Sequence, residues 1–379
     1  MRARARHSPT PVRRNLAALA LLVALMPGCS AGRGSSETAP RGTVAAQAAK
    51  PEPSAQERIR YYSGRIAESP RLYPMYTQLG IALLDRTKET HDPTLLAKAR
   101  EAEATALAIQ DNFESLLAMA AIQNYSHRFE DAIRWGRRAA DASVGGDAAR
   151  DPAVTALLVE ACLGFGKLEE AAGLVPRSVE EADDFHAAAS LGRWLAEAGR
   201  ADEAEKAYSR AAELARREDA PALAAWAETA AAGALIDSGR AAEATAHLEA
   251  AARLAPTTTF LLLHRAEAAQ ATGRSAEATA ILEEILRHDP DPAVEALAFV
   301  AARKAGDGAA AERHFRAAQQ GFQRAIEAGE VHTLGALAKL YLDADRNLDS
   351  ALALARENLQ WKRDRAAAET LAALEAQRR

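Results

Sequence analysis

Residues 191–211 read LGRWLAEAGRADEAEKAYSRA, and the order of small and apolar residues in this stretch decides the fold. Leu191-Gly192 and Leu195 are followed by Gly199, and a second amphipathic run begins near Ala204. Glycine commonly ends a helix because it adopts a left-handed conformation at little cost. The stretch therefore predicts two helices joined by a short turn, with small residues where the helices approach closely.

The same pattern recurs along most of the chain. Eight alanines occupy equivalent positions at intervals of 33, 39, 33, 40, 34, 33 and 40 residues: Ala99, Ala132, Ala171, Ala204, Ala244, Ala278, Ala311 and Ala351. A period near 34 residues is the length of a helix-turn-helix repeat. Glycines recur at the expected turns, and glutamates recur directly before the alanines, in the predicted first turn of each second helix: Gly166, Gly199, Gly239, Gly273, Gly306, and Glu170, Glu203, Glu243, Glu277. No run of alternating β-branched residues predicts a strand.

These copies resemble the tetratricopeptide repeat, whose pattern is W-x2-L-G-x2-Y, then A-x3-F, then A and P. The resemblance runs from about Tyr73 to the C-terminus, with departures such as Arg265 in place of the usual leucine. It implies an all-α, right-handed superhelical solenoid of about eight helix pairs. We also expect a leading helix near residues 55–68 and a closing helix near 365–377.

Some units depart from the regular period. The segments 204–221 and 311–329 predict lengthened second helices, because each step of 40 residues adds about two helical turns. The step of 39 residues contains SVGGD at 143–147, which predicts a longer loop. In the first unit, residues 87–93 (TKETHDP) predict a loop inside the helix pair.

The N-terminus divides the chain into three parts. Residues 1–28 combine five arginines with an apolar stretch at 16–26, which is typical of a processing signal. Gly28-Cys29 resembles the cleavage site of a bacterial lipoprotein signal, so we expect lipidation of Cys29; ordinary secretion with cleavage near Ala31 is the alternative. Residues 29–54 are rich in Ser, Gly, Ala, Pro and Thr and predict a flexible linker, followed by the repeat domain at 55–379. The chain is therefore expected to be exported and membrane-anchored, or else soluble in the periplasm or outside the cell.

Charge and cysteine content exclude several classes of protein. Without residues 1–28 the chain has 42 Lys and Arg against 52 Asp and Glu, a net charge of −10. Such an acidic repeat array does not favour nucleic acid, whose phosphates require clustered basic residues, and the membrane is reached only through the N-terminal lipid. Cys162 lies in an apolar run and is expected to be a buried, unreactive packing residue.

No pattern predicts catalysis. The chain has no H-E-x-x-H, CxxC, phosphate-binding loop, dinucleotide fingerprint or G-x-S-x-G elbow. Paired carboxylates such as Asp183-Asp184 are typical of exposed helices. We therefore predict neither enzyme activity nor a cofactor or metal site.

The expected binding surface is the concave groove, because the resemblance implies that the first helix of each pair lines it. Alignment on the small residue of each first helix selects eleven positions: Asn124, Glu160, His186, Arg193, Trp226, Phe260, Glu267, Gln270, Arg303, His332 and Lys339. Aromatic and arginine side chains are frequent binding anchors. The alternative for Trp226 and Phe260 is that they pack between neighbouring helices. Trp135, Trp194 and Trp361 occupy other helical positions and are expected to pack within the array.

Two functions remain open. The first is a non-catalytic scaffold or adaptor of the cell envelope that holds a protein or peptide in the groove. The second is a structural component of an envelope assembly, pilus or polysaccharide-export machine. The identity of the partner is not encoded in any of these motifs.

Overall fold

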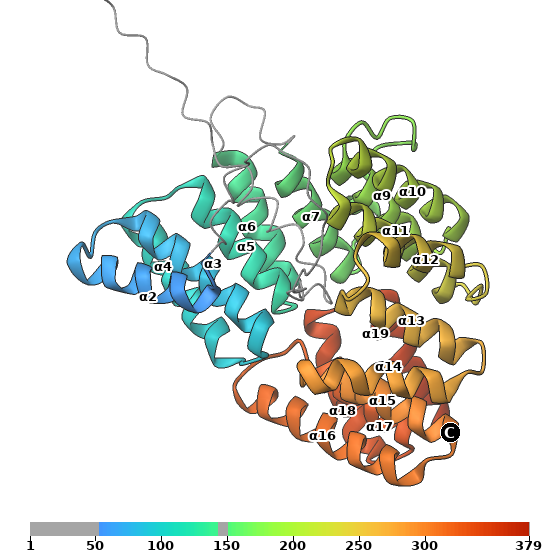
Figure 1. Cartoon of the computed structure of the whole chain (residues 1–379). Coiled ribbons are helices and arrows are strands. Elements are labelled where there is room, and N and C mark those ends of the chain that lie inside the picture. The colour runs from blue at the N-terminus through green and yellow to red at the C-terminus, as the bar shows by residue number, and fades with distance from the viewer. Residues whose placement is uncertain (1–52, 143–150, 379) are drawn as a thin grey trace, which may run out of the picture.

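The computed structural model describes residues 53–142 and 151–378, and every regular element in these two ranges is a helix. A leading helix, α2, is followed by eight pairs, α3/α4 to α17/α18, and a closing helix, α19, which together form a curved stack (Figure 1). Their bounds are Ala55–Glu68 (α2), Tyr73–Thr90 (α3), Thr94–Ile109 (α4), Phe113–Tyr125 (α5), Phe129–Ala142 (α6), Pro152–Gly164 (α7), Leu168–Ala172 (α8), Phe185–Glu197 (α9), Ala201–Arg217 (α10), Pro221–Asp237 (α11), Thr245–Leu254 (α12), Thr259–Ala271 (α13), Ser275–His288 (α14), Pro292–Ala305 (α15), Gly308–Glu327 (α16), Leu334–Ala344 (α17), Leu348–Trp361 (α18) and Arg365–Gln377 (α19). The predicted all-α repeat fold is confirmed, and α2 and α19 begin and end at the expected residues.

Several predicted features lie outside the described residues. They are the processing signal at 1–28, Cys29, the linker up to residue 52 and the loop at 143–147. Within the two described ranges, no helix combines the length and apolar character that a membrane span requires.

The turns inside the pairs end on glycine, as predicted. Gly166, Gly199, Gly239, Gly273 and Gly306 all have φ between 74° and 81°, the left-handed region that favours glycine. A basic residue follows four of these glycines and pairs with the glutamate three positions later, at nitrogen-to-oxygen distances of 2.5 to 3.2 Å: Lys167–Glu170, Arg200–Glu203, Arg240–Glu243 and Arg274–Glu277. This Gly-Lys/Arg-x-x-Glu pattern is visible in the sequence but was not part of the prediction.

The eight marker alanines are confirmed as close-contact positions. Seven of them are completely buried and Ala311 is 6% exposed. The small residues on the opposing helices are equally confined: a Cβ atom on Gly192 of α9 would lie 2.8 Å from the ring of Tyr208 on α10. The apolar core is correspondingly divided into clusters that each join neighbouring helices, such as Leu191, Leu195 and Tyr208 with α11.

The lengthened second helices are confirmed: α10 has 17 residues and α16 has 20. Two other expectations were wrong or incomplete. Residues 87–90 continue α3 instead of forming a loop, because the hydroxyls of Thr87 and Thr90 donate to backbone carbonyls four residues earlier and so fit the helix. Helix α12 begins at Thr245, which leaves Glu243 in the preceding turn, not in the first helical turn.

The third pair is also less regular than the spacing predicts. Its second helix, α8, has only five residues, and the chain from Gly173 to Asp184 is irregular. Gly173 and Pro176 explain the early end, because neither residue supports a continuing helix.

Candidate functional site in the concave groove

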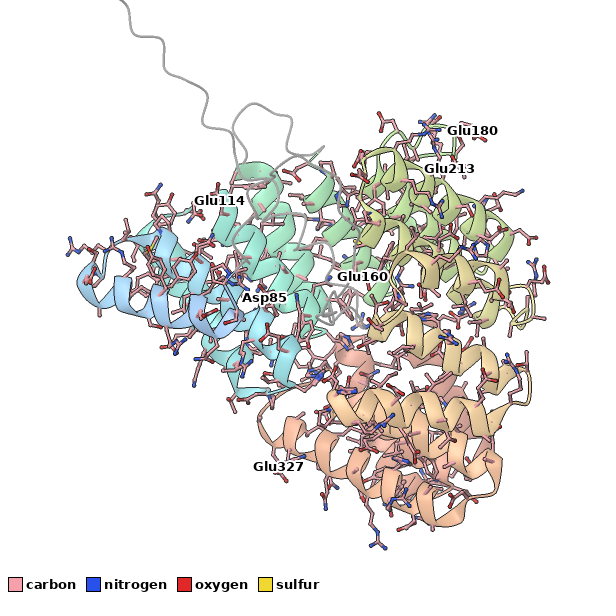
Figure 2. All side chains as sticks on the ribbon, viewed as in Figure 1. Asp85, Glu114, Glu160, Glu180, Glu213 and Glu327 are labelled. Carbon is pink, nitrogen blue, oxygen red and sulfur yellow. The ribbon has the colours of Figure 1, made fainter. Side chains whose placement is uncertain are left out.

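Ten of the eleven predicted groove residues lie on first helices. Asn124 is on α5, Glu160 on α7, His186 and Arg193 on α9, Trp226 on α11, the next three on α13, Arg303 on α15 and Lys339 on α17. His332 is different, since α17 begins at Leu334 and His332 lies in the turn before it. Arg303 and Lys339 are exposed, and the other nine are half-buried. Figure 2 shows Glu160 towards the centre of the molecule, whereas Glu180 and Glu213 lie at its edge.

Adjacent first helices bring several of these side chains together. Arg193 Nε donates to Glu160 Oε2 across α9 and α7 at 3.1 Å, and its Nη1 lies 3.8 Å from Glu197 Oε2. The Glu160 carboxylate raises the pKa of Arg193 above its usual range, so the guanidinium is permanently charged. The two charges therefore already satisfy each other in this part of the groove.

An aromatic row crosses α9, α11 and α13. The rings of Trp226 and Phe260 are stacked with centroids 6.1 Å apart, and Phe260 meets His264 edge-on at 4.5 Å. Trp226 also contacts Phe185 and Tyr208 at 5.9 and 6.0 Å. Both Trp226 and Phe260 pack against core clusters while remaining half-buried. Packing between neighbouring helices, the alternative weighed for these rings, therefore accounts for part of their surface.

Two carboxyl groups near this row lack a strong ion pair. Burial raises the pKa of Asp237 at the end of α11 and that of Glu267 on α13. The nearest base to Glu267 is His264, whose Nε2 is 4.0 Å from Glu267 Oε2. Repulsion from Asp237 adds to the rise at Glu267, whereas the positive charges of Arg365 and Arg193 oppose the rise at Asp237.

Several groove residues hold buried polar atoms that form no hydrogen bond within the protein. They are Asn124 Oδ1, His186 Nδ1, Trp226 Nε1, Gln270 Nε2 and His332 Nδ1, the last of which lies 3.8 Å from Glu330 Oε2. Buried polar atoms are normally hydrogen-bonded, so these atoms are exceptions. Arg303 and Lys339 differ, because the former donates to the carbonyl of Asp343 and the latter pairs with the carboxylate of Asp343 at 2.5 Å.

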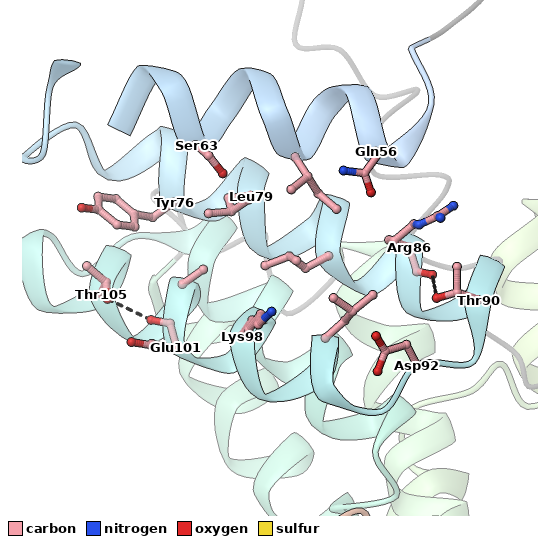
Figure 3. Close-up of a pocket in the computed structure, with 14 residues that line it drawn as sticks. Gln56, Ser63, Tyr76, Leu79, Arg86, Thr90, Asp92, Lys98, Glu101 and Thr105 are labelled. Atoms are coloured by element: carbon pink, nitrogen blue, oxygen red, sulfur yellow. Dashed lines mark hydrogen bonds between the residues drawn. The ribbon is translucent and has the colours of Figure 1, made fainter. Parts of the chain in front are cut away.

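A cleft that the sequence did not predict lies between α2, α3 and α4 (Figure 3). It encloses about 650 Å³, with Ile59, Leu79 and Leu83 among its apolar residues. In Figure 3, Gln56 and Ser63 on α2 lie opposite Lys98 and Glu101 on α4. Repeat alignment could not find it, because α2 precedes the first full repeat.

None of these arrangements forms a metal site. Within residues 53–142 and 151–378, no three His, Cys, Asp or Glu side chains are grouped closely enough to hold an ion. Cys162 is completely buried, as predicted, and burial raises the pKa of its thiol to about 12. The thiolate needed for nucleophilic chemistry is therefore suppressed at this position.

The repeated helix pairs resemble those of known proteins in sequence and in structure. Residues 235–298, from the end of α11 into α15, match the sequence pattern of the tetratricopeptide repeat. These residues carry tetratricopeptide repeats. A search of curated proteins found no match. Among solved structures, the chain is similar to a tetratricopeptide repeat protein from Parabacteroides merdae ATCC 43184, with 12% sequence identity and a TM-score of 0.37 over 77% of this chain and 97% of that one. Tetratricopeptide repeats typically mediate protein–protein interaction.

Proposed function

We propose that the chain is a non-catalytic scaffold that binds a protein or peptide in the concave groove of its tetratricopeptide repeats. The observation that carries this proposal is the meeting of side chains from consecutive first helices on one face. Arg193 and Glu160 meet across α9 and α7, and Trp226 and Phe260 meet across α11 and α13. Stacked repeats create such continuous surfaces, because equivalent positions align along the array.

The aromatic row supplies the anchor in this proposal. Trp226 and Phe260 are rigid, half-buried rings that keep part of their surface exposed. The carboxyl groups of Asp237 and Glu267 lie near the same helices, which favours a ligand that offers an apolar residue beside a basic one.

Capture of partners from a bacterial envelope extract tests the proposal. The double variant Trp226→Ala and Phe260→Ala should reduce capture strongly, because truncating a true anchor costs about 2 kcal/mol or more. The control is Tyr61→Ala with Tyr62→Ala, which removes a second aromatic pair, 5.2 Å apart on α2, outside the aromatic row. If the groove variant unfolds, the rings are core residues; if it stays folded and captures normally, the binding site lies elsewhere.

We further propose that the protein acts at the cell envelope, attached through a lipid on Cys29. The support is the leader sequence alone, with its arginines, apolar stretch and Gly28-Cys29. Fractionation of cells that express the native chain and Cys29→Ala tests the anchor. Equal distribution of both proteins between membrane and soluble fractions would favour ordinary secretion. Recovery of a stoichiometric envelope complex in the capture experiment would instead favour a structural role in an assembly or export machine.

A further inference from the structure

The N-terminal and C-terminal repeats touch each other along a line of contacts, here called the seam. It joins residues 91, 100, 125–128, 164–166 and 197 to residues 289–291, 329–332 and 361–365. Figure 1 shows the orange and red C-terminal helices folded back below α5 and α7. The partners are far apart in sequence: Arg100 Nη2 and Glu330 Oε1 are 2.8 Å apart although 230 residues separate them. His91 Nε2 likewise lies 2.8 Å from Asp289 Oδ1.

The seam follows one edge of the groove. His91 caps the end of α3, while residues 125–128, 164–166 and 197 lie at the ends of α5, α7 and α9. These are the C-terminal ends of consecutive first helices, so the C-terminal repeats cover the rim where those helices finish. In the described residues, each helix packs extensively only against the next helix along the chain or the one after it. The seam is therefore a contact of turns and side chains, not of helix faces.

One part of the seam has the form of a bound peptide. Residues 361–365 (WKRDR) comprise the last residue of α18, the three-residue turn 362–364 and the first residue of α19. The backbone N–H of Arg363 donates to the carbonyl of Gly164 at 2.7 Å, and the backbone N–H of Arg365 donates to Glu197 Oε1 at 2.8 Å. Two backbone donors of the segment are thus bound by two different repeats.

Gly166 shows how closely the segment approaches. A Cβ atom at this position would lie 2.7 Å from the backbone oxygen of Arg363, too close for any other residue without movement. The turn glycines Gly239 and Gly273 have the same left-handed backbone but no atom within 4 Å of a built Cβ. The left-handed turn alone explains glycine at those positions, whereas Gly166 also provides room for the segment.

Side chains complete the contact. The guanidinium of Arg363 lies 4.4 Å from the centroid of the Phe165 ring, and the guanidinium of Arg128 lies 5.0 Å from that of Trp361. The receiving repeats therefore offer a carbonyl and a carboxylate to two backbone N–H groups, a ring face to the Arg363 side chain and a cation to Trp361. The backbone contacts accept any residue except proline, whereas the two cation–ring contacts favour an arginine and an aromatic residue.

We propose that the seam at Phe165, Gly166 and Glu197 is a peptide-binding site that the chain occupies with its own residues 361–365, and that a partner's basic, tryptophan-containing segment replaces them. The internal segment then acts as an autoinhibitory ligand, alongside the Arg100–Glu330 and His91–Asp289 contacts that also join the two halves of the solenoid. The inference rests on the proposed role in protein binding and names a second surface for it, separate from the aromatic row.

A labelled peptide of residues 359–366 (LQWKRDRA) tests the site with the full-length chain. The triple variant Trp361→Ala, Arg363→Ala and Arg365→Ala removes the side-chain contacts of the internal segment, which weakens its hold on the site, and leaves the receiving residues unchanged. If the internal segment fills the site in about nine molecules of ten, the triple variant should bind the peptide about tenfold more tightly than the native chain.

A second substitution in the triple-variant background identifies the receiving site. Gly166→Ala should abolish peptide binding, whereas Gly239→Ala, which imposes the same backbone strain without a neighbouring atom, should leave it unchanged. Equal binding by the native chain and the triple variant, or no binding by either, would overturn the proposal. Should the triple variant lose helix content, Arg363→Ala alone removes the ring contact and should still tighten peptide binding. Because no native partner is needed, failure here is distinct from failure of the capture experiment.

Discussion

Gly192→Ala offers a direct test of how α9 packs on α10. The added Cβ would lie 2.8 Å from Tyr208 Cδ1 and 2.9 Å from both Cε1 and Cγ. The tyrosine is 3% exposed and its ring contacts Trp226 at 6.0 Å, so it has little freedom to move aside. The substitution should therefore force the two helices apart or displace the ring.

Two opposing effects set the size of the change. Alanine is about 1 kcal/mol better than glycine inside a helix. Overpacking a tight contact costs about 1–3 kcal/mol. The net destabilisation should be about 0–2 kcal/mol. Gly64→Ala in α2 provides the control, because no atom lies within 4 Å of its built Cβ and only the helical gain remains.

Urea unfolding followed by circular dichroism measures both variants. The free energy of unfolding of Gly64→Ala should exceed that of Gly192→Ala by about 1–3 kcal/mol. Adding Tyr208→Leu to Gly192→Ala should recover part of the difference, because the two residues are in contact and their effects should not be additive. If Gly192→Ala stabilises the chain as much as Gly64→Ala does, the close approach of α9 and α10 is refuted.

Three further changes probe the array and its seam. Ala204→Leu should lower the free energy of unfolding by about 1–3 kcal/mol, since this alanine is completely buried, whereas Ala201→Leu at the half-buried start of α10 should have little effect; equal thermal shifts would contradict the repeat register. Arg100→Ala should cost about 3–5 kcal/mol in urea unfolding, because it leaves the buried Glu330 carboxylate without its guanidinium, and a change below about 1 kcal/mol would show that this charge is already solvated. A hydrogen bond to an aspartate raises the pKa of His91 above 6.5, so its stabilisation should be complete below pH 6.5 and lost as pH rises through the raised value; His91→Gln should flatten the unfolding free energy over that range.

Local spacing was sufficient to predict the helix pairs. Turn glycines such as Gly199 and Gly239 end helices through their own backbone conformation, and buried alanines such as Ala204 mark contacts between neighbours in sequence. The loop prediction at residues 87–90 was wrong because polar residues, which usually indicate a loop, can also stabilise a helix through side-chain hydrogen bonds. The hydroxyl of Thr87 bonds back into α3, so a polar run expected to be a loop continued the helix.

The candidate groove was predictable only in part. Alignment placed Arg193 and Glu160 on one face, and the structure joins them. It did not reveal that this pair neutralises its own charges, or that Trp226 is half covered by neighbouring rings. Position in a repeat specifies the direction of a side chain, whereas its remaining exposure depends on the residues of adjacent repeats.

The amino-acid order alone determined the helices, their turns and their stacking, because extensive helix packing joins only neighbouring helices and therefore appears in the sequence as a regular period. Tertiary structure decided the seam. Arg100 and Glu330 meet only because each intervening repeat adds a small rotation and the array curves back on itself. The total curvature cannot be read from the spacing of residues in the sequence. For the same reason the sequence predicted that Trp361 packs within the array but not that its partner is Arg128, on the other side of the seam.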